Sequence, residues 1–283
     1  MRSVKLTVKV WMSAAVRLAV LLGIVVQALG LRAGWSQEPP QPRLDEEISK
    51  QEEIFRKQGA DVPRGYITNR GLSDYAELLP TGFCDTLGKL GSSDRWLDIG
   101  AGAGQAILAY YAPKDAAAPA EKCARSGARA RAVAMSIEDR RTDEWRQRAT
   151  SVGDDRIRYL SGKRLRQYSP EELGKFQIIT DVFGGFTYTE DLSQFVDKVL
   201  NLLEVGAGFY TLVPGVHLED GKDRLGSFYV TELENAAGRP EKVCSWLKKT
   251  TCVKVICESK SDWKRPTELI KSRRSAAMFL SRA

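Results

Sequence analysis

Residues 95–111 read RWLDIGAGAGQAILAYY, a short apolar run followed by a glycine-rich loop and a second apolar stretch. The run at 95–99 has the composition of a buried strand, and 103–111 has that of a helix. Alternate glycines let the backbone between them turn sharply, and they let a ligand approach without meeting a Cβ atom. The helix that follows offers free N–H groups at its positive end. The segment therefore predicts a strand, a ligand-binding loop and a helix.

The same alternation of apolar runs and helical stretches continues to the end of the chain. It is typical of buried parallel strands that alternate with covering helices. We expect strands at 95–99, 131–137, 156–160, 176–181, 207–213, 251–257 and 275–281, and helices at 103–111, 140–150, 190–203 and 240–249. The sequence thus predicts an α/β fold with a doubly wound, mostly parallel, seven-stranded sheet in a domain spanning 91–283.

The first 36 residues have the pattern of an export signal. Basic residues come first, an apolar run at 18–31 follows, and the small residues Gly34 and Ser36 come last. Because a stable membrane anchor needs about 20 apolar residues, we expect a cleaved signal peptide and a periplasmic or secreted protein. A short anchor, and a cytoplasmic protein with a misassigned start, stay open as alternatives.

Two further segments separate this signal from the predicted domain. Residues 37–43 contain adjacent prolines among polar residues and are expected to form a linker. Residues 44–90 are expected to form a helical lid, with one helix over 44–59 that stops at a glycine. A second helix is expected over 73–79, with Ser73 as its N-cap.

Charge and cysteine content narrow the possible partners. The chain has a formal charge of +7, but five basic residues and no acidic ones precede residue 37, which leaves 38 basic against 36 acidic residues. A nucleic-acid partner is therefore not expected, although a local patch such as Arg140 and Arg141 stays possible.

The five cysteines lack the spacing of a zinc site, so no metal is expected. Free buried thiols are the expected state, and Cys244 with Cys252 is the most local disulfide pair.

The spacing of the glycines distinguishes between cofactors. Dinucleotide-binding folds use GxGxxG, whereas this loop is GxGxG with Asp98 two residues before the first glycine. The spacing disfavours a nucleotide-dependent oxidoreductase. The acid, strand and glycines resemble motif I of the class I S-adenosylmethionine-dependent methyltransferases, and the resemblance extends over about residues 90–215.

This resemblance implies S-adenosylmethionine as the cofactor and a set of residues that would bind it. The amino-acid end of the cofactor would lie against the loop after the first strand, and its ribose against Glu138 after the second, although Glu138 or Asp139 could instead cap the next helix. The fourth strand and its loop would contribute Asp181 and Phe183, with Phe186 and Tyr188 as further aromatic candidates for the cationic sulfonium. The family often places an acid after the third strand for adenine, but this chain has Ser161, Gly162 and Lys163 there. The implied cofactor-binding set is Asp98, Gly100, Ala101, Gly102, Gly104, Glu138, Asp181, Phe183 and Arg70, the last of which could pair with the cofactor carboxylate.

The expected activity is methyl transfer to a small-molecule acceptor. Such a displacement depends chiefly on positioning and on exclusion of water. His217, the single histidine, is a weak candidate for a base if the acceptor must lose a proton. The alternative is an exported, degenerate methyltransferase fold that binds a ligand without catalysis, because S-adenosylmethionine is a cytosolic metabolite and the adenine-site acid is missing.

Overall fold

A computed structural model of the chain describes residues that belong to the unit Asp45–Ala283. The described residues are 46, 49, 53, 69–111, 123, 129–153, 155–189, 191–213, 215–217, 223–225, 233–234, 240–250, 253–260 and 267–274. The predicted signal peptide at 1–36 and the linker at 37–43 lie outside them. Of the predicted helix at 44–59, Glu46, Ser49 and Glu53 are described, and all three are helical. Among the described residues, none of the helices is both long and apolar enough to span a membrane.

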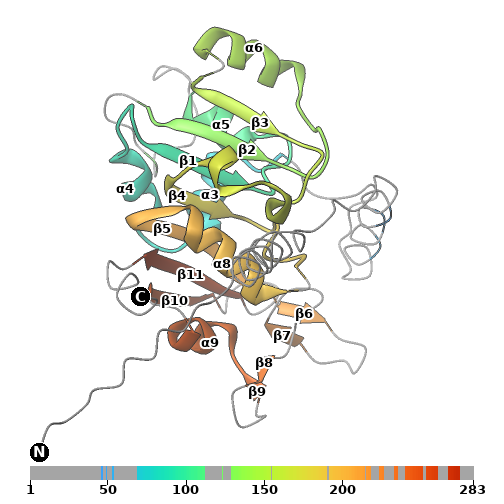
Figure 1. Cartoon of the computed structure of the whole chain (residues 1–283), viewed down its shortest axis with the longest axis vertical. Coiled ribbons are helices and arrows are strands. Elements are labelled where there is room, and N and C mark those ends of the chain that lie inside the picture. Colours follow the sequence, from blue (N-terminus) through green and yellow to red (C-terminus); the bar gives the residue numbers. More distant parts are fainter. Residues whose placement is uncertain are drawn as a thin grey trace, which may run out of the picture. The chain divides into compact units, whose positions relative to one another are not determined.

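A seven-stranded sheet forms the centre of this unit (Figure 1). In spatial order its strands are β10 (Val253–Lys260), β11 (Thr267–Arg274), β5 (Leu203–Val213), β4 (Phe176–Asp181), β1 (Arg95–Ile99), β2 (Arg131–Met135) and β3 (Ile157–Leu160). Strands β1 to β5 pair in parallel, whereas β11 is antiparallel to both of its neighbours. The predicted fold class, a mostly parallel seven-stranded sheet, is confirmed.

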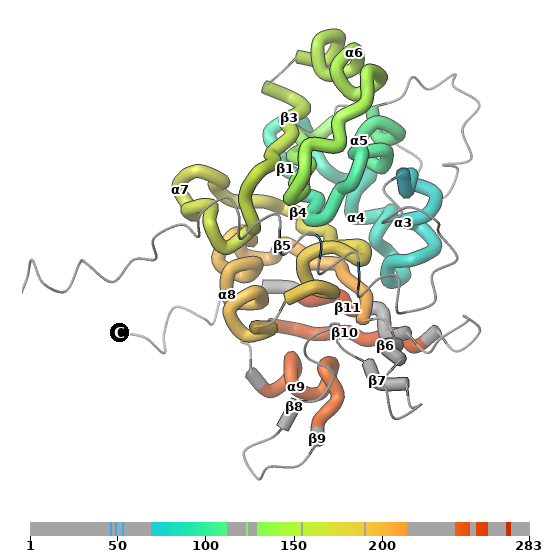
Figure 2. The backbone as a smooth tube through the Cα atoms, turned by 90° about the vertical axis from the view of Figure 1, so that its right-hand side faces the viewer, coloured from blue at the N-terminus to red at the C-terminus, as the bar shows by residue number. Residues whose placement is uncertain are grey.

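Helices cover both faces of this sheet because alternate strand residues point to opposite sides. Figure 2 shows α3 (Leu72–Leu78), α4 (Phe83–Gly88) and α5 (Gln105–Tyr110) on one side, and α7 (Pro170–Leu173) and α8 (Leu192–Leu202) on the other. Leu97 and Val133 pack in one hydrophobic cluster with α8 and with α9 (Val243–Thr250). Trp96 and Ala132 pack in the other, with α3, α4 and α5. The helix α6 (Asp143–Val152) contributes Trp145 to this second cluster.

Two small antiparallel pairs and a short 3₁₀ helix complete the described elements. The pairs are β6 (Gly215–His217) with β7 (Asp223–Leu225), and β8 (Leu233–Glu234) with β9 (Pro240–Glu241). The 3₁₀ helix, η2 (Leu165–Gln167), lies between β3 and α7 in the chain.

The predicted boundaries differ from the structure at the last strand and at the start of α3. The last strand lies at Thr267–Arg274, ahead of the predicted 275–281, which is outside the described residues. Gly71, and not Ser73, is the N-cap of α3, because Asp74 in the first turn accepts a hydrogen bond of 2.6 Å from the Gly71 N–H. This contact satisfies the Gly71 N–H at the helix start.

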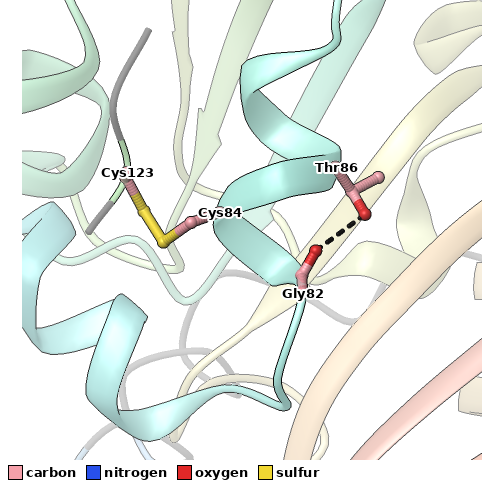
Figure 3. The surroundings of a disulfide bond; sticks show 4 residues. All are labelled: Gly82, Cys84, Thr86 and Cys123. Carbon is pink, nitrogen blue, oxygen red and sulfur yellow. Dashed lines mark hydrogen bonds between the residues drawn. A yellow bond between two sulfur atoms is a disulfide. The ribbon is translucent and has the colours of Figure 1, made fainter.

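Two disulfides link separate elements, which corrects the expectation of free thiols. Cys84 on α4 is bonded to Cys123, which precedes β2 in the chain (Figure 3). Cys244 on α9 is bonded to Cys257 on β10, so the predicted pair of Cys244 with Cys252 is wrong. The reason is strand alternation, because Cys257 lies on the side of β10 that packs against the cluster containing Cys244.

Candidate functional site

The carboxyl ends of β1 and β4 meet at the point where the strand order reverses. From β1 the chain continues outward to β2 and then β3, whereas β4 and β5 lie on the other side of β1. Ile99 at the end of β1 is paired with Asp181 at the end of β4. The loop after β1 leads to α5 on one face, and the loop after β4 leads to α8 on the other. Open α/β sheets bind their ligands at such a switch point.

Asp98 lies at this point, and its carboxylate is completely buried among hydroxyl groups. The Tyr75 hydroxyl on α3 donates to it, at 3.0 Å from Oδ1 and 2.9 Å from Oδ2. The Thr180 hydroxyl on β4 donates to Oδ1 at 2.7 Å and accepts a hydrogen bond of 2.8 Å from the Trp96 indole N–H. Asp98 therefore joins the predicted lid to the two central strands.

Burial raises the pKa of the Asp98 carboxyl to about 7, although hydrogen bonds from Thr180 and Tyr75 act in the opposite direction. The cause is the loss of hydration, which disfavours the charged form. The sequence predicted Asp98 as a binding residue but did not predict Tyr75 or Thr180 as its partners. The only sequence signal for Thr180 is its place directly before Asp181, which is expected at the same edge of the sheet as Asp98; the structure pairs Thr180 with Asp98 in the parallel register of β1 and β4.

The three glycines after Asp98 share a left-handed backbone conformation, and two of them are also needed for close packing. Gly100, Gly102 and Gly104 all have positive φ values, of 73°, 55° and 76°, which strongly favour glycine. A Cβ on Gly100 would lie 2.3 Å from the Gly184 Cα, and one on Gly104 would lie 2.3 Å from the Trp145 ring. Gly100 and Gly104 thus allow close packing within the fold.

Gly102 is partly exposed at the tip of the loop. Its carbonyl accepts a hydrogen bond of 2.5 Å from the Tyr159 hydroxyl on β3. The neighbouring Ala101 is buried, and its N–H donates to the Met135 carbonyl at the end of β2 at 2.9 Å. These bonds hold the loop against the ends of β2 and β3, and Gly100 and Gly102 are its solvent-accessible positions.

The loop after β4 is held by Asp181, whose carboxylate is turned into its own loop. Its Oδ1 accepts from the Gly184 N–H and its Oδ2 from the Phe186 N–H, each at 2.9 Å. Burial raises the pKa of Asp181 to about 7, and these hydrogen bonds act against the shift. Asp181 therefore shapes the loop, and its predicted contact with a cofactor stays a prediction.

Phe183 stands out in this loop because its φ of 55° lies in the left-handed region that non-glycine residues seldom adopt. The Arg70 guanidinium lies 4.7 Å from the centroid of its ring. Burial lowers the pKa of Arg70, while Tyr75, Asp74 and Tyr188 act to raise it. The structure thus brings together two predicted site residues from the lid and the β4 loop.

Phe186 has a different place in this loop. It is fully buried and packs edge-on against Phe195 of α8, with 5.8 Å between the ring centroids. It is therefore a core residue and does not line the loop surface.

The end of β2 differs from these buried positions, because its acidic side chains are partly exposed and paired with arginines. Glu138 accepts from Nε of Arg140 at 2.9 Å and also from its Nη2. Asp139 accepts from Nε and Nη2 of Arg141 at 2.8 and 2.6 Å. Thr142 caps α6, so the alternative of Glu138 or Asp139 as its cap is wrong. The patch suggested at Arg140 and Arg141 is neutralised by these pairs.

The predicted site also includes His217 and the loop after β3. His217 ends β6 and pairs in register with Asp223, but its side chain is outside the described part, so its role as a base stays a prediction. After β3, the Gly162 N–H donates to the Ile137 carbonyl at 2.8 Å, which joins the loop at the missing adenine acid to the end of β2. Within the described residues, no group of three or more His, Cys, Asp or Glu side chains is arranged to hold a metal ion.

Comparison with known proteins found similarity in solved structures. No family model matches the sequence, and no curated protein sequence is similar to it. An N-methyltransferase from Bradyrhizobium japonicum, solved with S-adenosyl-L-homocysteine, is 13% identical, covers 81% of this chain and 98% of its own, and has a TM-score of 0.44. The magnesium protoporphyrin IX methyltransferase from Synechocystis is 12% identical over 82% of this chain and 97% of its own, with a TM-score of 0.45.

An rRNA methylase from Streptococcus thermophilus is 12% identical over 68% of this chain and 93% of its own, with a TM-score of 0.41. The chain's own strand pairing identifies its fold. The order β10-β11-β5-β4-β1-β2-β3, with β11 as the antiparallel strand, is that of the Rossmann-like fold of class I methyltransferases.

Proposed function

We propose that this domain binds S-adenosylmethionine at the carboxyl ends of β1, β2 and β4 and transfers its methyl group to a small-molecule acceptor. The observation that carries the proposal is the loop at 100–104. Its glycines have left-handed backbone conformations at the switch point of the sheet, and with Asp98 and the preceding strand they make up the segment that resembles motif I.

The residues around this loop fit the chemical groups of the cofactor. Gly102 is partly exposed and has no Cβ to obstruct a ligand. Glu138 is exposed enough to accept the ribose hydroxyls, and Arg140 already fixes its orientation. The Phe183 ring offers an aromatic face to a cation, and Arg70 beside it offers a guanidinium to a carboxylate.

The contribution of the chain to catalysis would be one of placement. The cofactor supplies an electrophilic methyl group on a sulfonium. Asp98 and Asp181 hold the two loops by hydrogen bonds to α3, β4 and the loop backbone, which keeps the binding residues in fixed positions. His217 would act as a base for an acceptor that must lose a proton. A small-molecule acceptor is favoured by the balanced charge of the chain after residue 36, with 38 basic and 36 acidic residues.

We also propose that the protein is exported and works in an oxidising compartment. The bonds Cys84–Cys123 and Cys244–Cys257 support this proposal, since disulfides persist in such compartments and are rare in the cytosol. N-terminal sequencing of the exported protein should find a start near residue 37. An intact Met1 on a membrane-bound protein would favour the anchor instead, and a cytosolic chain that starts after residue 31 would favour a misassigned start.

A binding module without catalysis is the second candidate, and the loop after β3 favours it. Ser161, Gly162 and Lys163 stand there in place of an acid that would recognise adenine, so the cofactor would be held without that contact. The two candidates share the same site and differ in turnover.

Titration calorimetry with S-adenosylmethionine tests the binding shared by both candidates. We expect the parent chain to bind and Gly102→Val to lose binding, because the new side chain obstructs the approach to the loop. Gly91→Ala is the control, since its Cβ would lie no closer than 3.7 Å to its nearest neighbour, Asp94. Circular dichroism would show that each variant is folded.

Equal affinity in the parent and in folded Gly102→Val would exclude this site. Formation of S-adenosylhomocysteine in the presence of small amines, alcohols or thiols would favour the enzyme. Binding with no turnover of any of them would favour the binding module.

A further inference from the structure

Three arginines lie on neighbouring strands in the half of the sheet away from the candidate site. Arg95 begins β1, Arg131 begins β2, and Arg158 is the second residue of β3. Arg95 is paired with Arg131 in the parallel register, and Arg158 with Val133 two residues further along β2. All three lie in phase with strand residues of the same hydrophobic cluster, so their side chains are on one face of the sheet.

This arrangement is electrostatically unfavourable by itself. Like charges directly opposite each other destabilise a sheet. The pKa of the Arg95 guanidinium lies below its ordinary value, first because of burial and then because of the positive charges of Arg158 and Arg131. Within the described part of the chain, no carboxylate pairs with Arg131 or Arg158, whereas Arg140, Arg141 and Arg146 each have one. This face of the sheet therefore carries the positive charges of three neighbouring arginines, and neither Arg131 nor Arg158 has a carboxylate partner among the described residues.

The structure also holds the first of these guanidinium groups in place. Arg95 lies over the Phe176 ring at 4.4 Å from its centroid, and its Nη1 donates to the Lys175 carbonyl at 3.3 Å. Gly174 makes room for it, because a Cβ there would lie 2.4 Å from Nη1. Arginine has five N–H donors in a planar fork, so further donors are left for a ligand after this one bond.

We propose that Arg95, Arg131 and Arg158 form a binding site for the phosphate group of a small soluble molecule. Neighbouring strands are about 4.8 Å apart and each residue rises about 3.3 Å, so the Cα atoms of Arg95 and Arg158 are roughly 12 Å apart, and long arginine side chains across that distance can converge on one tetrahedral oxyanion. A nucleic acid would need a longer basic track, and the charge of the chain after residue 36 is close to balanced. The site is separate from the proposed cofactor site and does not depend on it.

Thermal unfolding of the full chain in inorganic phosphate and in glycerol 3-phosphate tests this proposal, with sodium chloride keeping the ionic strength constant. Both anions should raise the midpoint of the parent in a saturable way. In Arg131→Gln and Arg158→Gln the apparent affinity should fall at least about tenfold, because each loses a charge-assisted hydrogen bond. Without phosphate, both variants should unfold at the same temperature as the parent or at a higher one, because a like charge has been removed.

Arg148→Gln on α6 is the matched control and should respond to phosphate as the parent does. Tighter binding of glycerol 3-phosphate than of phosphate would identify an ester as the ligand. The proposal is overturned if neither anion stabilises the parent or if all variants respond equally. It is also overturned if only a single-stranded oligonucleotide distinguishes the parent from Arg131→Gln, which would point to nucleic acid.

Discussion

The ends of β1 and β2 each carry a carboxylate that the sequence predicts to bind the cofactor, but their surroundings are opposite. Asp98 is completely buried, and hydroxyl groups of Tyr75 and Thr180 satisfy it. The Glu138 side chain is 36% exposed and faces the guanidinium of Arg140. A buried carboxylate with neutral donors contributes mainly to the fold, whereas an exposed one can exchange its partner for a ligand. The predicted site thus combines a carboxylate that stabilises the fold with one that is accessible to a ligand.

The largest expected effect is that of Asp98→Ala on stability. The change leaves the buried hydroxyls of Tyr75 and Thr180 without their acceptor, and each unsatisfied group costs roughly 1 to 3 kcal/mol. We therefore expect the free energy of unfolding, measured in urea, to fall by about 2 to 5 kcal/mol. Glu138→Ala should change it by less than about 1 kcal/mol. Equal losses in the two variants would remove the distinction between the two carboxylates.

Glu138→Ala should instead reduce the affinity for S-adenosylmethionine. The loss of charge-assisted hydrogen bonds to ribose corresponds to roughly 1.5 to 3 kcal/mol, or about tenfold to a hundredfold. Calorimetry on the folded variant measures this change, with Asp139→Ala as the matched control from the adjacent acid–arginine pair. If Glu138→Ala binds as tightly as the parent, the ribose lies elsewhere.

The strands at the switch point could be predicted from the sequence, because their apolar runs are continuous. The predicted 95–99 and 176–181 agree with β1 and β4. The last strand could not, because β11 reads TELIKSRR and the more apolar window follows it. Successive side chains of β11 point to opposite faces of the sheet, so Ile270 is buried while Lys271 is partly exposed, and the strand lacks a continuous apolar run.

Some partners of the predicted site residues could not be inferred from the sequence. The loop at 98–104 is local, whereas Tyr75 contacts Asp98 across 23 residues, and nothing in the sequence marks that contact. The row of Arg95, Arg131 and Arg158 depends on the register of three strands, which the sequence does not fix. The pairing of Cys244 with Cys257 depends in the same way on which side of β10 each residue occupies.

The buried carboxylates should also make stability depend on pH. In the folded state the pKa of Asp98 and of Asp181 is about 7, against an ordinary value of 3.8. Between these values the folded state holds protons that the unfolded state has lost, so stability falls as the pH rises from about 4 to 7. Each group contributes at most about 1.4 kcal/mol per pH unit. Urea unfolding across this range should show a shallower slope in Asp98→Asn, and an unchanged slope would assign the effect to other groups.

Tyr75→Phe should have a smaller effect that acts through the same carboxyl. Removing one neutral hydrogen bond costs about 1 kcal/mol, and the aromatic ring that packs against Phe83 is kept. Because this bond lowers the pKa of Asp98, its loss should raise that pKa and extend the fall in stability above pH 7. Infrared titration of the carboxyl group follows this shift. A lower pKa in the variant would contradict the hydrogen bond from Tyr75.

The smallest effect on stability is expected for Arg140→Gln, which breaks the partly exposed pair of Arg140 with Glu138 after β2. Its pair with Glu138 is partly exposed, so water competes with the attraction and salt screens it. The free energy of unfolding should change by less than about 1 kcal/mol at low salt, and the difference from the parent should shrink further in 1 M sodium chloride. The loss in Asp98→Ala should be nearly independent of salt, because no solvent separates that carboxylate from its partners. A large, salt-independent loss in Arg140→Gln would show that the end of β2 is also part of the stable core, since only a desolvated ion pair resists screening and leaves a costly unpaired charge when it is broken.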